Sequence, residues 1–75
     1  MSRKSTVDAV VLRTVDVGEA DRFCIFLTRE KGKIAARARA VRKPGSRMGG
    51  SILPMRRVTV ELVEHGDHWI VASAT

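Results

Sequence analysis

Apolar and polar residues alternate along five stretches of this chain. A two-residue period places successive side chains on opposite faces, which is typical of a β-strand. Val, Ile, Thr and Phe recur within these stretches, and these residues favour strands. Strands are therefore expected at residues 7–17, 22–28, 33–41, 55–64 and 69–75. The first is less regular, because Val10, Val11 and Leu12 are consecutive, as in a strand that bends around a barrel and buries both faces.

The connections between these strands carry turn residues. Short connections that each contain Gly are expected at residues 18–21, 29–32 and 65–68, and Gly32 is suited to the left-handed conformation that closes a hairpin. The longest connection, residues 42–54, is rich in Gly, Pro and Ser and predicts an irregular insert with at most one helical turn near residues 51–53. The pattern predicts one all-β domain over residues 1–75, a small five-stranded antiparallel barrel. The OB fold carries its variable insert between strands 3 and 4, and an SH3-like barrel is the main alternative.

The second stretch is apolar on both faces. Phe23, Ile25 and Leu27 share one face, while Cys24 and Phe26 share the other. We expect Phe23 to lie in the core and Phe26 to be the partly exposed ring. An exposed ring of this kind could stack against a nucleic-acid base.

The third stretch combines small apolar and basic residues. Strand geometry places one set inside, Ile34, Ala36, Ala38 and Ala40, and a basic row outside, Lys33, Arg37 and Arg39. A helix competes here, because Ala and Arg are good helix formers. However, a helix would separate Arg37 from Arg39 by about 200° around its axis. The preceding hairpin signal and the alternation favour the strand.

Positive charge is concentrated in the middle of the chain. Residues 29–57 hold ten of the fourteen Lys and Arg but only one acid, Glu30, whereas the other residues hold four bases and seven acids. Such a concentration points to a polyanionic partner, most simply nucleic acid. A row of cations can track regularly spaced phosphates and release their condensed counterions. A solvated surface is the plainer interpretation.

Catalytic and metal-binding chemistry is sparse. Cys24 is the single cysteine, so no internal disulfide can form, and one Cys with two His cannot complete a four-ligand zinc site. We expect Cys24 to be a small buried hydrophobe, His65 and His68 to be solvated turn residues, and the acids around residues 16–21 to form a polar turn. We expect no catalytic residues, no metal, no cofactor and no enzyme activity. No targeting signal or membrane span is recognisable, and we expect a soluble, cytoplasmic protein.

Several motifs together resemble a known family, the N-terminal domain of the bacterial recombination mediator RecO, a DNA repair protein. The matching stretches are VVLRTVDVGEADR at 10–22, FLTREKGKIAARARAVRKPGSR at 26–47, GGSILPM at 49–55 and HWIVASAT at 68–75. The family pattern runs through a G-E-x-D turn, an L-T-x-x-x-G-K hairpin, an A-R-x-x-x-S-R loop and a G-x-L-x-P entry to the fourth strand. The motifs occur in the family's order and span nearly the whole chain.

The resemblance implies an OB fold that binds single- and double-stranded DNA and anneals complementary strands in DNA repair and homologous recombination. It also implies RecR, a second mediator, as a partner of this domain, and a bacterial protein associated with the nucleoid. The expected DNA contacts are the cations on the third strand, in the insert and at the start of the fourth strand: Lys33, Arg37, Arg39, Arg42, Lys43, Arg47, Arg56 and Arg57. Family members continue into a longer helical domain, often with a zinc site, that binds single-stranded-DNA-binding protein (SSB). The sequence of 75 residues lacks that domain, so we expect neither zinc nor SSB binding.

Two other functions are compatible with the residues. The basic face could dock an acidic protein partner, of which RecR is one example. A small RNA-binding barrel is the other alternative, and competition between DNA and RNA separates it from a DNA-binding module.

Overall fold

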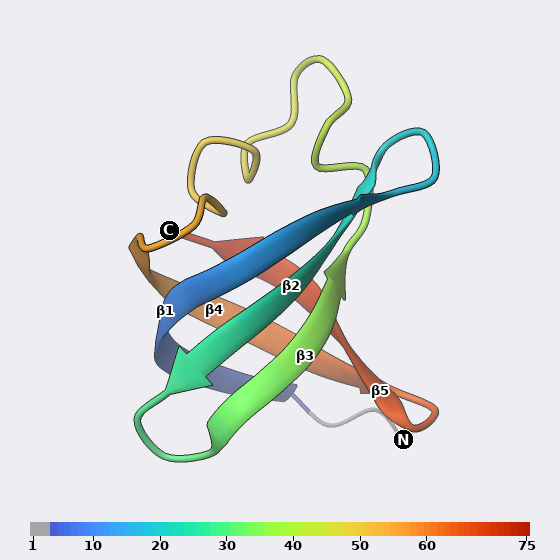
Figure 1. Cartoon of the computed structure of the whole chain (residues 1–75). Helices are drawn as coiled ribbons and strands as arrows, with labels where there is room; N and C mark the ends of the chain where they lie inside the picture. The colour runs from blue at the N-terminus through green and yellow to red at the C-terminus, as the bar shows by residue number, and fades with distance from the viewer. Residues whose placement is uncertain (1–3) are drawn as a thin grey trace.

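The chain folds into a small closed β-barrel. The computed structural model describes residues 4–75 and contains β1 (Lys4–Val17), β2 (Asp21–Thr28), β3 (Gly32–Ala38), β4 (Arg57–His65) and β5 (His68–Ala74). Around the barrel the order is β1-β2-β3-β5-β4, and β4 pairs again with β1 (Figure 1). This is the five-stranded arrangement of an OB fold, so the predicted fold class is confirmed. The β3–β5 pairing is parallel and short, while the other four pairings are antiparallel.

Strand β1 bends and belongs to both halves of the barrel. Its first part, Lys4–Val10, pairs with β4, and its second part pairs with β2. The register on β2 shifts between Val11 and Arg13, which lets the strand turn from one partner to the other. The run of consecutive apolar residues predicted such a bend, and the prediction is confirmed.

The interior is filled by one face of each strand. Phe26 has 0% exposure and lies between Val11 on β1 and Ile34 on β3 in the paired register. Phe23 lies on the outer face and is 39% exposed. The prediction that Phe23 is core and Phe26 exposed is therefore wrong. Both faces of β2 are apolar, so alternation alone could not decide which one faces inward.

Strand β3 is shorter than expected. It ends at Ala38, although the alternating pattern continues to residue 41. The carboxylate of Asp21 accepts a hydrogen bond of 2.8 Å from the backbone N–H of Ala40, whose φ is 58°. That left-handed residue turns the chain away from the barrel wall, so Arg39 and Ala40 are not strand residues.

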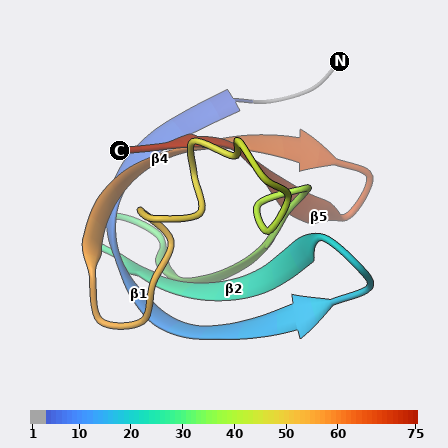
Figure 2. The same cartoon turned by 90° about the horizontal axis from the view of Figure 1, so that it is seen from above.

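The insert between β3 and β4 covers one end of the barrel. Seen from above, it lies across the opening of the strand ring (Figure 2). Its Ile52 and the nearby Val41 are buried, and Met48 packs against the same core. The backbone N–H groups of Ser51 and Ile52 donate to the carbonyl of Met48 at 3.0 and 3.1 Å. This single helix-like turn forms slightly earlier than predicted.

The short connections follow the sequence signals. Gly32 closes the β2–β3 hairpin with φ 67°, as expected. The two-residue turn between His65 and His68 joins β4 to β5. Residues 4–75 include no helix with the length and apolar character required to cross a membrane.

Candidate nucleic-acid interface

Most basic side chains of the barrel have no acidic partner. The chain has fourteen Lys and Arg, of which Arg3 lies outside the described residues. Four of the remaining thirteen lie within 4.0 Å of a carboxylate: Lys4, Arg22, Arg37 and Arg42. The other nine have no such partner within residues 4–75, and eight of them fall in the basic segment: Arg29, Lys31, Lys33, Arg39, Lys43, Arg47, Arg56 and Arg57. Such cations are available to a polyanion without first breaking an ion pair.

Arg42 is occupied by contacts with the β1–β2 turn. Its guanidinium donates to the carbonyl oxygens of Gly18 at 2.6 Å and Asp21 at 3.2 Å. It also lies 3.6 Å from a carboxylate oxygen of Asp16. These contacts tie the beginning of the insert to the β1–β2 turn. Because its donors are occupied, Arg42 is poorly suited to the phosphate contact expected from the sequence.

Asp21 also connects the β1–β2 turn to the end of β3 and the start of the insert. It accepts the Ala40 N–H and, at 2.9 Å, Nε–H of Arg37. The pKa of this carboxyl is lowered from the usual 3.8, mainly because of the hydrogen bond from Ala40 and next because of the hydrogen bond from Arg37. Arg37 is therefore half-exposed but paired. Asp16 is likewise paired with Arg22, and no cluster of metal-ligating residues occurs in residues 4–75.

The predicted contact residues are spread over the barrel wall and the insert. Lys33 is the second residue of β3 and Arg57 the first of β4, whereas Arg39, Lys43 and Arg47 belong to the insert. Nearly the whole of β3 separates Lys33 from Arg39, since Lys33 and Ala38 are roughly 17 Å apart at about 3.3 Å per strand residue. We call Lys33, Arg57 and the neighbouring Arg29 the bend cluster, because these residues lie near the bend of β1; the insert cations are Arg39, Lys43 and Arg47.

Paired register explains how the bend cluster comes together. Val10 of β1 pairs with Arg57 of β4 and with Leu27 of β2, and Leu27 pairs with Lys33 of β3. One cross-strand row thus links two cations through two apolar residues. Neither the spacing of Lys33 and Arg57 in the sequence nor their charge alone indicates this proximity.

An apolar stripe runs along the outer face of β2. Phe23, Ile25 and Leu27 point outward, and Phe23 and Leu27 are 39% and 45% exposed. Phe23 pairs with Val15 on one side and with Arg37 on the other. In OB folds the β2–β3 face is a common binding surface for oligonucleotides. The exposed ring in this position is Phe23, while Phe26 is enclosed in the core and offers no face for stacking.

Sequence reasoning missed two functional candidates. The sequence predicts that Phe23 lies in the core, and it places Arg29 in the basic segment but not among the expected DNA contacts. The L-T-R sequence at the end of β2 places Arg29 directly after buried Thr28. That position would have been a usable signal if the register of β1 against both neighbours had been known.

Other candidate groups behave as their plainer interpretations predicted. Cys24 is fully buried, and burial raises the pKa of its thiol to about 11, which leaves it protonated and unreactive. His65 and His68 are exposed, and their rings meet edge to face with centroids 5.9 Å apart.

Comparison with known proteins gives a consistent set of relatives. A family model described as "Recombination protein O N terminal" matches residues 1–70. Proteins named DNA repair protein RecO are 43% identical over 67 residues in Bifidobacterium adolescentis, 47% over 57 in Myxococcus xanthus and 49% over 57 in Bifidobacterium animalis. The matches cover 89%, 76% and 76% of this chain but 27%, 23% and 24% of the relatives. The chain thus spans about a quarter of the length of the curated relatives it matches.

Proposed function

Because the chain belongs to the recombination protein O N-terminal family, we propose that it is the DNA-binding module of a recombination mediator that acts in DNA repair. The observation that carries the proposal is the set of eight cations in residues 29–57 that have no acidic partner among residues 4–75. Their number exceeds what the surrounding acids can neutralise. A polyanion such as DNA supplies the missing negative charge.

Phosphate contacts provide most of the affinity in this proposal. The bend cluster and the insert cations neutralise backbone phosphates and release counterions, so binding is strong at low salt and largely independent of base sequence. Arg side chains can also hold one phosphate with two parallel hydrogen bonds.

The apolar stripe gives single strands an additional contact. Unpaired bases pack against Leu27 and Ile25 and stack on Phe23, while the cations at both ends of the stripe hold the backbone. A duplex keeps its bases inside the helix and uses only the phosphate contacts. Bringing two complementary strands to one cationic surface reduces their mutual repulsion, which is the physical basis for annealing.

Protein partners are a second candidate function, favoured by a separate observation. Leu53 and Met55 of the insert are 40% and 74% exposed, and Arg56 follows them directly. An exposed apolar pair beside a cation suits an acidic protein surface. A mediator partner of the RecR type would fit this end of the barrel, whereas SSB binding is not expected of these residues.

Fluorescence anisotropy tests the DNA-binding proposal. Labelled single strands of several unrelated sequences, the corresponding duplexes and an RNA strand are titrated at low and moderate salt. We expect DNA binding that weakens steeply with salt, with similar affinity for each sequence and an advantage for single strands. The absence of DNA binding at low salt would contradict the proposal; preferential RNA binding would support the RNA alternative, and binding of RecR alone the protein-partner alternative.

A further inference from the structure

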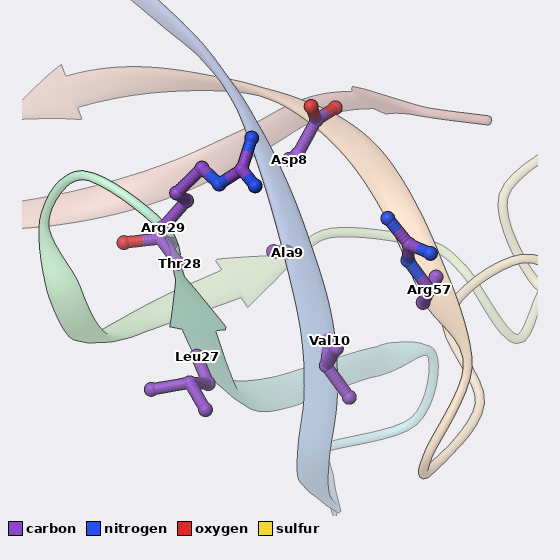
Figure 3. A pocket seen from close by; sticks show the side chains of 7 residues that line it. All are labelled: Asp8, Ala9, Val10, Leu27, Thr28, Arg29 and Arg57. Carbon is purple, nitrogen blue, oxygen red and sulfur yellow. The ribbon is translucent and has the colours of Figure 1, made fainter.

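A depression lies on the outside of the barrel where β1 bends. Its volume is about 260 Å³, and its lining combines apolar and charged residues. Arg29 and Arg57 lie on the two sides of β1 (Figure 3). Along β1, Val10 and the neighbouring Leu27 lie at one end of the depression and Asp8 lies at the other. The two arginines come from the end of β2 and the start of β4, which are far apart in the sequence. They meet at one site because Ala9 and Val10 of β1 pair with the end of β2 on one edge and with the start of β4 on the other.

Hydrogen bonds fix the segment that carries Arg29. The hydroxyl of Thr28 donates to the carbonyl of Gly32 at 2.8 Å and accepts the backbone N–H of Lys31 at 2.9 Å. Thr28 is buried, so these bonds hold the hairpin firmly at the point where Arg29 emerges. A guanidinium on a fixed backbone loses less conformational freedom when it binds a ligand.

Arg57 is positioned from the other side. The backbone N–H groups of Met55 and Val11 donate to the carbonyls of Val11 and Arg56 at 2.6 and 2.9 Å. Met55 has φ 67°, a conformation that is unfavourable for a residue with a side chain. The chain therefore accepts local strain where it delivers Arg57 to the bend, and strain of this kind often accompanies functional positions.

The charges around the depression favour an anion. Neither arginine lies within 4.0 Å of a carboxylate among residues 4–75. Asp8 lines the site, but its carboxylate accepts a hydrogen bond of 3.0 Å from the hydroxyl of Thr59. Two guanidinium groups against one carboxylate leave a net positive site. We propose that Arg29 and Arg57 grip a single phosphate group of a nucleic-acid backbone across the bend of β1.

This inference rests on the proposed DNA-binding function and specifies where the strand passes. The row Arg57, Val10, Leu27 and Lys33 connects the depression to the outer face of β2 and β3. A strand lying along the apolar stripe therefore continues over the bend, with its next phosphates held by the arginine pair. The depression is accessible from the surface and large enough for a phosphate with part of its sugar.

A double-mutant cycle tests whether the two arginines act on one group. Binding of a fluorescent oligothymidylate is measured for the wild type, Arg29→Gln, Arg57→Gln and the double variant. A charged hydrogen-bonded contact is worth enough for each single change to weaken binding about tenfold or more. If both arginines hold one phosphate, the double variant loses less than the product of the two single losses. Multiplicative losses would overturn the shared grip.

Two further measurements separate this site from general surface charge. Asp8→Asn removes the opposing charge but keeps an oxygen acceptor for Thr59, so binding should tighten severalfold; weaker or unchanged binding would overturn the assignment. Lys4→Gln removes one charge from an existing ion pair with Glu61 and serves as the control for net charge. A loss equal to that of Arg29→Gln would also count against the site.

Inorganic phosphate tests the site independently of DNA. In a ¹⁵N-labelled protein, the side-chain Nε–H signals of Arg29 and Arg57 should shift together on titration with phosphate, and Arg57→Gln should abolish the shift at Arg29. Unmoved signals would overturn the inference even if the wild type binds DNA, in which case the proposed function stands. Joint shifts without any DNA binding would instead support the anion site and contradict the proposed function.

Discussion

The two phenylalanines of β2 provide a matched test of how this barrel binds single strands. Phe23 is 39% exposed on the outer face, while Phe26, three residues later, is 0% exposed in the core. A stacked base contributes roughly 1–3 kcal/mol, which corresponds to about 5- to 150-fold in affinity. We expect Phe23→Ala to weaken single-strand binding by this factor and to leave duplex binding nearly unchanged. Phe23→Leu, which keeps apolar surface without a ring, should lose most of the same affinity.

Phe26 should respond in the opposite way. Truncating a buried Phe to Ala costs about 3–5 kcal/mol, whereas about 0.05–0.15 kcal/mol per residue gives this chain a total stability of roughly 4–11 kcal/mol. Phe26→Ala therefore loses a large part of the free energy of unfolding, and Phe26→Leu is the folded alternative. It should unfold at lower denaturant concentration but bind single strands normally.

Anisotropy on a single strand and its duplex, with denaturant unfolding of each variant, separates stacking from folding. Equal losses on the single strand and the duplex for Phe23→Ala would refute stacking at this ring. Weakened single-strand binding by folded Phe26→Leu would refute the assignment of that ring to the core.

Three further predictions concern the insert, its anchor and the thiol. Gly49→Ala should destabilise the fold by about 1–3 kcal/mol in denaturant unfolding, because the added Cβ would lie 2.8 Å from the carbonyl oxygen of Val41; Gly50→Ala, with open space around it, should not. The pKa of Asp21 is lowered in the folded state, so its stabilising effect is complete above the unfolded value near 3.8 and disappears as pH falls through the folded value. The free energy of unfolding of Asp21→Asn should therefore depend less on pH below about pH 4 than that of the wild type. The same dependence in both proteins, measured by denaturant unfolding at several acidic pH values, would contradict this. The thiol of Cys24, with a pKa of about 11, should resist a thiol reagent at pH 8 in native protein and react rapidly in denaturant.

The barrel could be predicted from the sequence because the alternation of side chains and the turn residues indicate the same strands. Alternation located all five strands, and Gly32 marked the hairpin that it closes. The run of three apolar residues in β1 indicated a strand with two partners, which the pairing confirms. Each of these inferences depends on neighbouring residues alone, so no knowledge of distant contacts was required.

Distant contacts explain where the sequence interpretation failed. The inward face of β2 is set by the register with Val11 and Ile34, so alternation could not distinguish Phe23 from Phe26. The end of β3 depends on Asp21, which lies in another strand and accepts the N–H of Ala40. Strand propensity continues past that point, but the hydrogen bond from a distant element turns the chain.

The candidate site, too, was predictable only as far as it depends on local sequence. Charge density in residues 29–57 identified the basic segment, but not which cations are already occupied. Arg42 donates to the β1–β2 turn, whereas Arg29 has no acidic partner in the part of the chain that the structure describes. Grouping Lys33 with Arg57 requires the pairing order of four strands, which composition does not contain.

The salt dependence of single-strand binding tests whether cations without acidic partners hold the DNA backbone. The measurement compares the wild type with the triple variant Lys33→Gln, Lys43→Gln and Arg47→Gln, and with Lys4→Gln as the ion-paired control. Each lost phosphate contact reduces the slope of log affinity against log salt by about 0.7 for single strands. We expect a slope shallower by about 2 in the triple variant and unchanged in the control. An unchanged slope in the triple variant would contradict this expectation.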